Sequence, residues 1–411
     1  MAPSRQSLRA LDALNFFLAD VRDGLGPYLA IYLIAVRGPS HGWDEATVGS
    51  VITIAGIVGL VAQTPAGALI DRVRNRRAII VVAALLVTLS SVALPFVGGF
   101  ALVTATQAIA SLAGAVFAPA IAAVTLGLTG PRLFAPRVGR NEAFNHAGNA
   151  TAAGIAALLA WSFGPVVVFW LMGALAVFSV VAASRIRGDE IDEELARGLT
   201  DDTEAKAGGW ATLLTNRPLL IFAVIAFTFH LANAAMLTSV SQLLTKVVGK
   251  DSATSLVALC ILAAQLVMVP IAVVVGRKTD AWGRKPIFLV AFGVLALRGV
   301  LYTVSDDAYW LLAVQALDGI GAGIFGALFP IVIADLTRGS GRFNVAQGAV
   351  STMQGLGAAL SATMAGVVIV AEGYTIAFWT LAAVAAVGFV LYARLMPETK
   401  PAAVPPAQVP S

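Results

Sequence analysis

The sequence is poor in cysteine, histidine and charge, and each scarcity excludes a class of protein. Its one cysteine, Cys260, cannot form an internal disulfide, and with three histidines it leaves little scope for a thiolate metal site. Only 12% of the residues are charged, whereas a soluble protein carries about 25%. The charges therefore cannot be spread evenly along the chain, and long uncharged runs must exist.

Recognisable catalytic motifs are also missing. The sequence has no Walker phosphate-binding loop, no Gly-x-Ser-x-Gly and no His-Glu-x-x-His. We therefore expect no enzymatic activity, no cofactor and no metal. The net charge of +4 does not indicate a nucleic-acid partner, because the basic residues flank apolar runs.

Uncharged apolar runs make up most of the chain, which is 58% hydrophobic. A run of about 20 apolar residues spans a bilayer as a helix. We predict an all-α integral membrane protein with an N-terminal six-helix bundle (1–184), a hydrophilic linker (185–217), a C-terminal six-helix bundle (218–396) and a disordered proline-rich tail (397–411). The predicted spans are 10–36, 46–70, 78–97, 100–128, 142–162, 165–184, 218–246, 253–275, 287–304, 308–336, 344–371 and 374–396.

Basic residues predict the orientation. All but five of the 27 lysines and arginines fall on the side of the two termini and the linker. The exceptions are Arg22, Arg37, Lys246, Lys250 and Arg298. Since cytoplasmic loops carry the excess of Lys and Arg, we expect both termini and the linker in the cytoplasm, in a multi-pass protein of the inner membrane.

A short charged loop between the second and third spans recurs between the eighth and ninth. In each copy a glycine stands four residues before an aspartate, and basic residues follow. The loops resemble Gly-x-x-x-Asp-Arg-x-Gly-Arg-Arg/Lys, the signature of the major facilitator superfamily, with Arg74, Asn75 and Ala281 as departures from it. We assign conformational-gate roles to Gly67, Asp71, Arg72 and Arg76 in the first copy and to Gly276, Asp280, Gly283, Arg284 and Lys285 in the second.

This resemblance implies two six-helix bundles related by a pseudo-twofold axis along the membrane normal, with a small-molecule substrate held between them and exposed to each side in turn. It also implies that the loop acids Asp71 and Asp280 steady contacts between neighbouring spans at the cytoplasmic face. We expect protons and membrane lipid as further partners, and a monomer.

Three charges lie inside the first span. A charge at the centre of a membrane helix costs at least ~2.5 kcal/mol on insertion scales, so each is a functional candidate. Asp20 and Asp23 share a helix face, one turn apart, whereas Arg22 points away from it. Two close carboxylates in low dielectric suit a proton carrier. An interhelical salt bridge with Arg22 or Arg298 is the structural alternative.

The second half has its own polar candidates. Asp318 is the acid of the tenth span, and Arg298 in the ninth span is its possible ion-pair partner, in a structural or a transport role. His230 and Asn233 share a face of the seventh span at i, i+3 spacing. Glu142, Asn145, His146 and Asn149 form a polar face on the fifth span, where gating or loop anchoring is an alternative to binding.

The function predicted from these residues is secondary active transport of a small solute, coupled to protons. We slightly favour an efflux-type antiporter, although the Gly-Pro-x-x-Gly-Gly motif that many exporters of the superfamily carry in the fifth span is missing. The alternatives are a solute importer, either symporter or uniporter, and a non-transporting membrane sensor with the same fold.

Overall fold

A computed structural model of the protein describes residues 3–23, 29, 32–37, 42–163, 166–199 and 210–400, and these contain helices and no strands. The first half comprises α1 (Arg5–Asp23), η1 (Tyr32–Arg37), α4 (Glu45–Arg72), α5 (Arg76–Val92), η2 (Leu94–Phe96), α6 (Phe100–Gly114), α7 (Phe117–Phe163) and α8 (Val167–Arg185). Three short elements follow: η3 (Gly188–Glu190), η4 (Leu195–Arg197) and α9 (Trp210–Thr215). The second half comprises α10 (Arg217–Val248), α11 (Lys250–Trp282), α12 (Arg284–Leu301), α13 (Ala308–Ala316), α14 (Asp318–Leu336) and α15 (Phe343–Leu395).

Eight helical stretches of the described chain are long and apolar enough to cross a membrane. Two of them are double, because Gly130 (φ 67°) breaks α7 and Gly373 (φ 87°) breaks α15. Positive φ values are easily adopted only by glycine, so these two residues let the chain turn sharply between consecutive spans. With both stretches divided, and with α1 and α12 added, the described residues give the twelve predicted spans.

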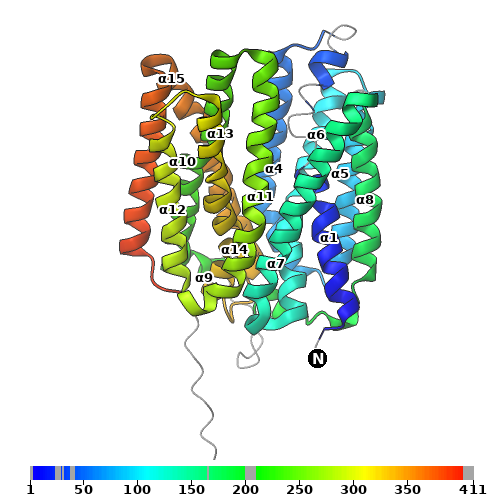
Figure 1. The fold of residues 1–411 in the computed structure, drawn as a ribbon. Helices are drawn as coiled ribbons and strands as arrows, with labels where there is room; N and C mark the ends of the chain where they lie inside the picture. The colour runs from blue at the N-terminus through cyan, green and yellow to red at the C-terminus, as the bar shows by residue number, and fades with distance from the viewer. Residues whose placement is uncertain are drawn as a thin grey trace, which may run out of the picture.

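The helices form two bundles that lie side by side (Figure 1). Helices α1, α5, α6 and α8 occupy one side of the view, and α10, α12, α13 and α15 occupy the other, with α4, α7, α11 and α14 between them. Each half has its own hydrophobic core; the core of the second half also takes in part of α7. The start of α1 and the end of α15 lie at the bottom of the view in Figure 1, where α8 also ends. We call this end of the molecule the linker side.

Polar side chains fix where several helices begin. Asp44 accepts a hydrogen bond from the Thr47 backbone N–H (2.7 Å) at the start of α4. Asn75 does the same for α5 and Asn216 for α10. These caps satisfy N–H groups that have no partner within the helix, so they place the boundaries between the charged loops and the apolar spans.

Two sequence-based boundaries were wrong. Helix α1 begins at Arg5 rather than at residue 10, and the predicted loop at 129–141 is helical beyond Gly130. Runs of apolar residues end at the first charge, whereas the helices continue, because arginines there find partners or reach the surface. The linker is also less solvated than predicted, since Ile186, Ala196 and Leu199 are buried.

The predicted disordered tail starts too early. Met396 is buried and Glu398 forms hydrogen bonds, so the chain stays packed as far as Lys400. The remainder of the tail, 401–411, lies outside the described residues.

Candidate functional site

An arginine lies in the middle of the second bundle and contacts two other helices. Arg298 of α12 pairs through Nη1 with the Asp318 carboxylate of α14. Its Nη2 donates to Asn233 Oδ1 of α10 (2.6 Å), and Nε lies 3.3 Å from Met236 Sδ. The Arg298 side chain is 2% exposed. A buried charge of this kind is tolerated only when its donors are satisfied, and these contacts supply the partners.

The acid of this pair is the accessible member. The Asp318 side chain is 16% exposed, and its second oxygen accepts from Gln315 Nε2 (3.3 Å). Gln315 in turn accepts from the Tyr302 hydroxyl, which is buried. We call Asn233, Arg298, Asp318, Gln315 and Tyr302 the embedded network. Asp318 is therefore the member of the pair with exposed surface, whereas the guanidinium is almost fully buried.

His230 lies one turn before Asn233 on α10 and borders the aromatic core. Its Nδ1 lies 3.1 Å from the Ala226 carbonyl oxygen, an acceptor only, so this nitrogen carries the proton. The ring packs edge-on against Phe325, with centroids 4.6 Å apart. In the neutral form of the ring, this tautomer presents Nε2 as a hydrogen-bond acceptor.

The first half places its polar candidates on α1 and α7. Asp20 and Arg22 are half-buried on α1, and the side chain of Asp23 lies outside the described part of the chain. On α7, Asn149 is half-buried and Asn145 is buried.

His146 and Glu142 lie where the two halves meet. His146 Nδ1 is 2.8 Å from Gln265 Oε1 of α11, and Nε2 is 3.9 Å from the Glu142 carboxylate. Of the polar face predicted on the fifth span, His146 therefore bridges the two halves. That position is compatible with gating and with solute binding.

The first gate loop reaches across to the other half. Asp71, at the end of α4, accepts hydrogen bonds from the Val345 N–H (2.9 Å), the Asn344 N–H (3.3 Å) and Asn344 Nδ2 (2.8 Å). These are the first residues of α15, where the partial positive charge of a helix N-terminus stabilises an anion. Asn344 Nδ2 also donates to the Ala196 carbonyl of the linker (2.9 Å).

The charged side chains of the second gate loop pair within their own half. Asp280 is 50% exposed and pairs with Arg284 Nη1 (2.6 Å), while Arg284 Nε binds Asp335 (2.9 Å). The sequence predicted one role for Asp71 and Asp280, but their contacts differ. Gly283 (φ 91°) adopts a conformation that favours glycine, immediately before α12.

Each gate loop is contacted by the segment that follows its bundle, the linker in the first half and the C-terminal segment in the second. Arg76 is buried and pairs with Glu193 of the linker (2.5 Å), whereas Arg72 is exposed. Glu398, beyond α15, accepts from the backbone N–H groups of Arg284 (2.9 Å) and Lys285 (3.1 Å). The linker thus braces the first loop, and the C-terminal segment caps the helix after the second.

Close backbone contacts join the halves on the linker side. A Cβ added to Gly67 would lie 2.1 Å from the Asn344 carbonyl oxygen, and one on Gly348 would lie 2.2 Å from that of Gln63. The offset from Gly67 to Gly276 equals that from Gly139 to Gly348.

The second crossing repeats the first. A Cβ on Gly139 would lie 2.4 Å from the Ala272 carbonyl oxygen, and one on Gly276 would lie 2.9 Å from that of Ala135. The pair α4 with α15 and the pair α7 with α11 are therefore equivalent crossings related by the pseudo-twofold axis. At both, glycine is required because any side chain would force the helices apart.

A second ion cluster was missed in the sequence. Asp12 of α1 accepts from Arg137 Nη2 (2.8 Å) and from Arg140 Nε (2.9 Å) and Nη2 (2.8 Å) on α7. The sequence does place an acid, Asp12, at the start of the first span and two arginines, Arg137 and Arg140, before the fifth. Their opposite charges could have suggested the pairing. The cluster ties α1 to α7.

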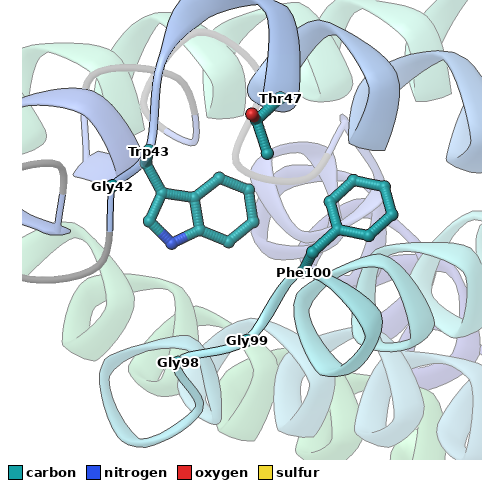
Figure 2. Close-up of a pocket in the computed structure, with 6 residues that line it drawn as sticks. All are labelled: Gly42, Trp43, Thr47, Gly98, Gly99 and Phe100. Carbon is teal, nitrogen blue, oxygen red and sulfur yellow. The ribbon is translucent and has the colours of Figure 1, made fainter.

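Figure 2 shows a small pocket between the segment before α4 and the segment before α6. It has a volume of about 410 Å³ and is lined by Trp43, Thr47, Phe100 and three glycines. None of the embedded charges lines it. Trp at a membrane boundary commonly anchors a helix end, and Trp43 packs near Phe100 with ring centroids 6.4 Å apart.

Comparison with known proteins assigns the fold and the family. The sequence matches the Major Facilitator Superfamily over residues 12–297 and 252–411. A proton:xylose symporter, XylE, has the same fold, with a TM-score of 0.74 and 13% identity over 96% of each chain. The human organic anion transporter MFSD10 (TETRAN) gives a TM-score of 0.71 and 16% identity over 95% of this chain and all of that one.

The chain belongs to the major facilitator superfamily, whose members are multi-pass membrane transporters of small molecules. It is 54% identical over 394 residues to an uncharacterised MFS-type transporter of Mycobacterium tuberculosis, Rv2456c in strain H37Rv and MT2531 in strain CDC 1551. The alignment covers 95% of this chain and 93% of that protein. A second uncharacterised MFS-type transporter of that organism, Rv1250, is 29% identical over 126 residues, 30% of this chain and 21% of the relative.

Proposed function

We propose that the protein is a secondary active transporter that moves a small solute by alternating access and couples this movement to protons. The observation that carries the proposal is the embedded network, in which a buried Arg298 holds a partly accessible Asp318. A charge pair inside a membrane bundle is costly to bury, so a functional role is the default explanation.

In the proposed cycle, Asp318 at rest pairs with Arg298, which would otherwise be left as an unpaired buried charge. A donor group of the solute then shares the Asp318 carboxylate, and His230 Nε2 offers a nearby acceptor. Asp20 in the first half, with Asp23 as the alternative, carries the proton. Release on the other side requires the crossings at Gly67 and Gly139 to separate.

Direction is the finer part of the proposal. We slightly favour proton-coupled efflux, with import as the alternative outcome of the same experiment. The protein would be reconstituted in proteoliposomes and supplied with a panel of labelled solutes, with and without an imposed pH gradient. Solute movement against the proton flux supports an antiporter, and movement with it supports an importer. No gradient-dependent movement of any solute would favour the non-transporting sensor.

Asp20→Asn separates coupling from binding in this assay. We expect the variant to lose pH-driven transport while it still exchanges solute across the membrane without a gradient, because the proton carrier is gone but the crossings still open. Asp23→Asn would show this pattern instead if Asp23 is the carrier. Full pH-driven transport in a protein lacking Asp20, Asp23 and Asp318 would exclude the mechanism.

We further propose that the linker side is cytoplasmic, that the protein resides in the inner membrane and that it acts as a monomer. Asp189 is exposed on the linker side and Asp306 is exposed between α12 and α13. In a Cys260→Ala background, we expect Asp306→Cys to react with an impermeant maleimide in intact cells and Asp189→Cys to react only after permeabilisation. The opposite pattern would invert the topology.

A further inference from the structure

A groove of about 610 Å³ runs between α1 and α8 on the linker side of the first bundle. Three arginines, Arg5, Arg9 and Arg185, line it and are exposed. Arg5 and Arg9 are one helical turn apart, so they lie on the same ridge of α1. Gln6 Nε2 donates to the Arg185 carbonyl oxygen (3.3 Å) and holds the ends of the two helices together.

The groove becomes apolar away from this basic rim. The ridge that begins with Arg5 and Arg9 continues through Ala13 to Phe17, and Ala13 and Ala182 leave the hollow that larger residues would fill. Phe17 and Phe178 close the far end with stacked rings, centroids 5.1 Å apart. From Arg5 to Phe17 the helix rises ~18 Å, comparable with half the ~30 Å hydrocarbon core of a bilayer.

Neighbouring acids are engaged elsewhere. Glu190 accepts from the Ser4 N–H (3.0 Å) and Ser4 Oγ (2.9 Å) and lies 3.4 Å from Arg187 Nε. Asp12 is paired with Arg137 and Arg140. Within the described ranges, no carboxylate forms an ion pair with the three arginines of the groove. The rim is therefore positively charged with nothing from the described chain to neutralise it.

We propose that this groove binds one anionic phospholipid from the leaflet on the linker side, with its phosphate between Arg5, Arg9 and Arg185 and an acyl chain along the apolar floor. Basic pockets between membrane helices bind anionic headgroups, and each arginine near the membrane surface contributes ~1 kcal/mol. A soluble anion would leave the apolar floor of the groove empty, and a neutral lipid would leave the three arginines without an anionic partner. Charge and depth together select an anionic lipid.

Native mass spectrometry of the full chain in detergent tests the site, with phosphatidylglycerol or phosphatidylcholine added. We expect phosphatidylglycerol to bind at least ten-fold more tightly. Arg9→Gln with Arg185→Gln should weaken it about thirty-fold, which corresponds to ~2 kcal/mol for two arginines. The matched control is Arg217→Gln with Arg394→Gln, which removes two exposed arginines from the linker side of the second bundle and should change binding less than two-fold.

Filling the floor distinguishes a lipid from a free anion. Ala13→Phe keeps all three arginines but narrows the groove, and we expect it to weaken phosphatidylglycerol binding at least ten-fold. Glycerol 3-phosphate, which has the charge without the chains, should not displace the lipid. The proposal would be overturned if the two lipids bound equally, or if the double variants in the groove and in the control lost binding equally. It would also be overturned if Ala13→Phe left binding unchanged, or if glycerol 3-phosphate displaced the lipid. Elution as a single species with an unchanged unfolding temperature shows that each variant is folded.

Discussion

The two halves of the protein share their backbone arrangement on the linker side but surround it with different charges. Gly67 and Gly276 occupy equivalent crossings, yet Asp71 binds the opposite half and Asp280 binds its own. Of the two loop acids, only Asp71 therefore forms hydrogen bonds across the halves within the described part of the chain. The glycine crossings are therefore repeated in both halves, whereas the hydrogen bonds of the loop acid across the halves are not.

The same contrast holds inside the membrane. In the second half, Arg298 and Asp318 form a pair supported by Asn233 and Gln315. The position of the first half that aligns with Asp318 is Ala110, so this network has no counterpart there. The first half instead carries its acids on α1. The following predictions test these contrasts, from the largest expected effect to the smallest.

Arg298→Ala should have the largest effect. It leaves Asp318 and Asn233 without their partner, and breaking a buried ion pair costs about 3–5 kcal/mol. We expect a lower unfolding temperature in detergent and no transport. Asp318→Asn should also lower the unfolding temperature, because it leaves the buried Arg298 guanidinium without its counter-charge, but by less, because the asparagine can still accept a hydrogen bond; it should also lose pH-driven transport.

The exchange of the two residues provides the control. Asp318→Arg with Arg298→Asp retains the pair but moves the cation to the accessible position, so we expect the fold to recover and transport to remain absent. Restored transport in the swapped protein would show that the pair is purely structural.

Gly139→Val and Gly348→Val should each reduce transport at least ten-fold, and by similar factors, because they block equivalent crossings on the linker side. Gly154, where an added Cβ meets nothing within 4 Å, is the matched control, and Gly154→Val should transport normally. The measurement is the initial rate of solute uptake or efflux in proteoliposomes. A strong effect at only one of the two crossings would contradict the symmetry of closure.

Asp71→Asn should slow cycling more than Asp280→Asn does, while solute binding stays nearly unchanged in both. A hydrogen bond to a charged group contributes ~1.5–3 kcal/mol, and Asp71 makes three across the halves. We expect about a ten-fold slower rate for Asp71→Asn and a two- to three-fold change for Asp280→Asn. Equal rates, or a raised dissociation constant at unchanged turnover, would remove the distinction between the loops.

Glu398→Gln should have the smallest effect, confined to the second half. Burial alone would raise the pKa of Glu398, but backbone N–H groups, including those of Arg284 and Lys285, lower it below its usual value. Its contribution is therefore complete above the unfolded pKa of about 4.3 and disappears as the pH falls through the lower folded value. Loss of a helix cap costs ~1 kcal/mol.

Thermal unfolding between pH 7 and pH 3 measures the contribution of Glu398 to stability. The difference between the native protein and Glu398→Gln should be largest at neutral pH and should close in acid. Asp189→Asn, which changes an exposed acid outside the helix caps, serves as the control. A difference that grows in acid would contradict the assigned direction of the pKa shift.

The fold was predictable because it depends on local properties. Uncharged runs mark the spans, and the repeated loop marks the duplication, so no long-range contact is needed to recognise either. The partnership of Arg298 with Asp318 could be suggested for the same reason, since few charges lie deep enough to need each other.

The contacts of the gate loops could not be predicted in this way. Asp71 meets Val345, and Arg284 meets Glu398, across long sequence separations that no local pattern encodes. The two aspartates look equivalent in sequence, and only the packing of α15 and of the C-terminal segment makes them different. Glu398 was assigned to a disordered tail because prolines surround it, although its carboxylate caps α12.

The glycine crossings also constrain how this protein can evolve. Because each crossing brings a glycine against the backbone of the facing helix, there is no side chain whose size could be varied in small steps. Selection for faster or slower transport must therefore act on surrounding groups such as Asp71 and Asn344, where single substitutions change the closed state by modest amounts. Divergence among transporters of this kind should then concentrate around the crossings, while the glycines themselves persist.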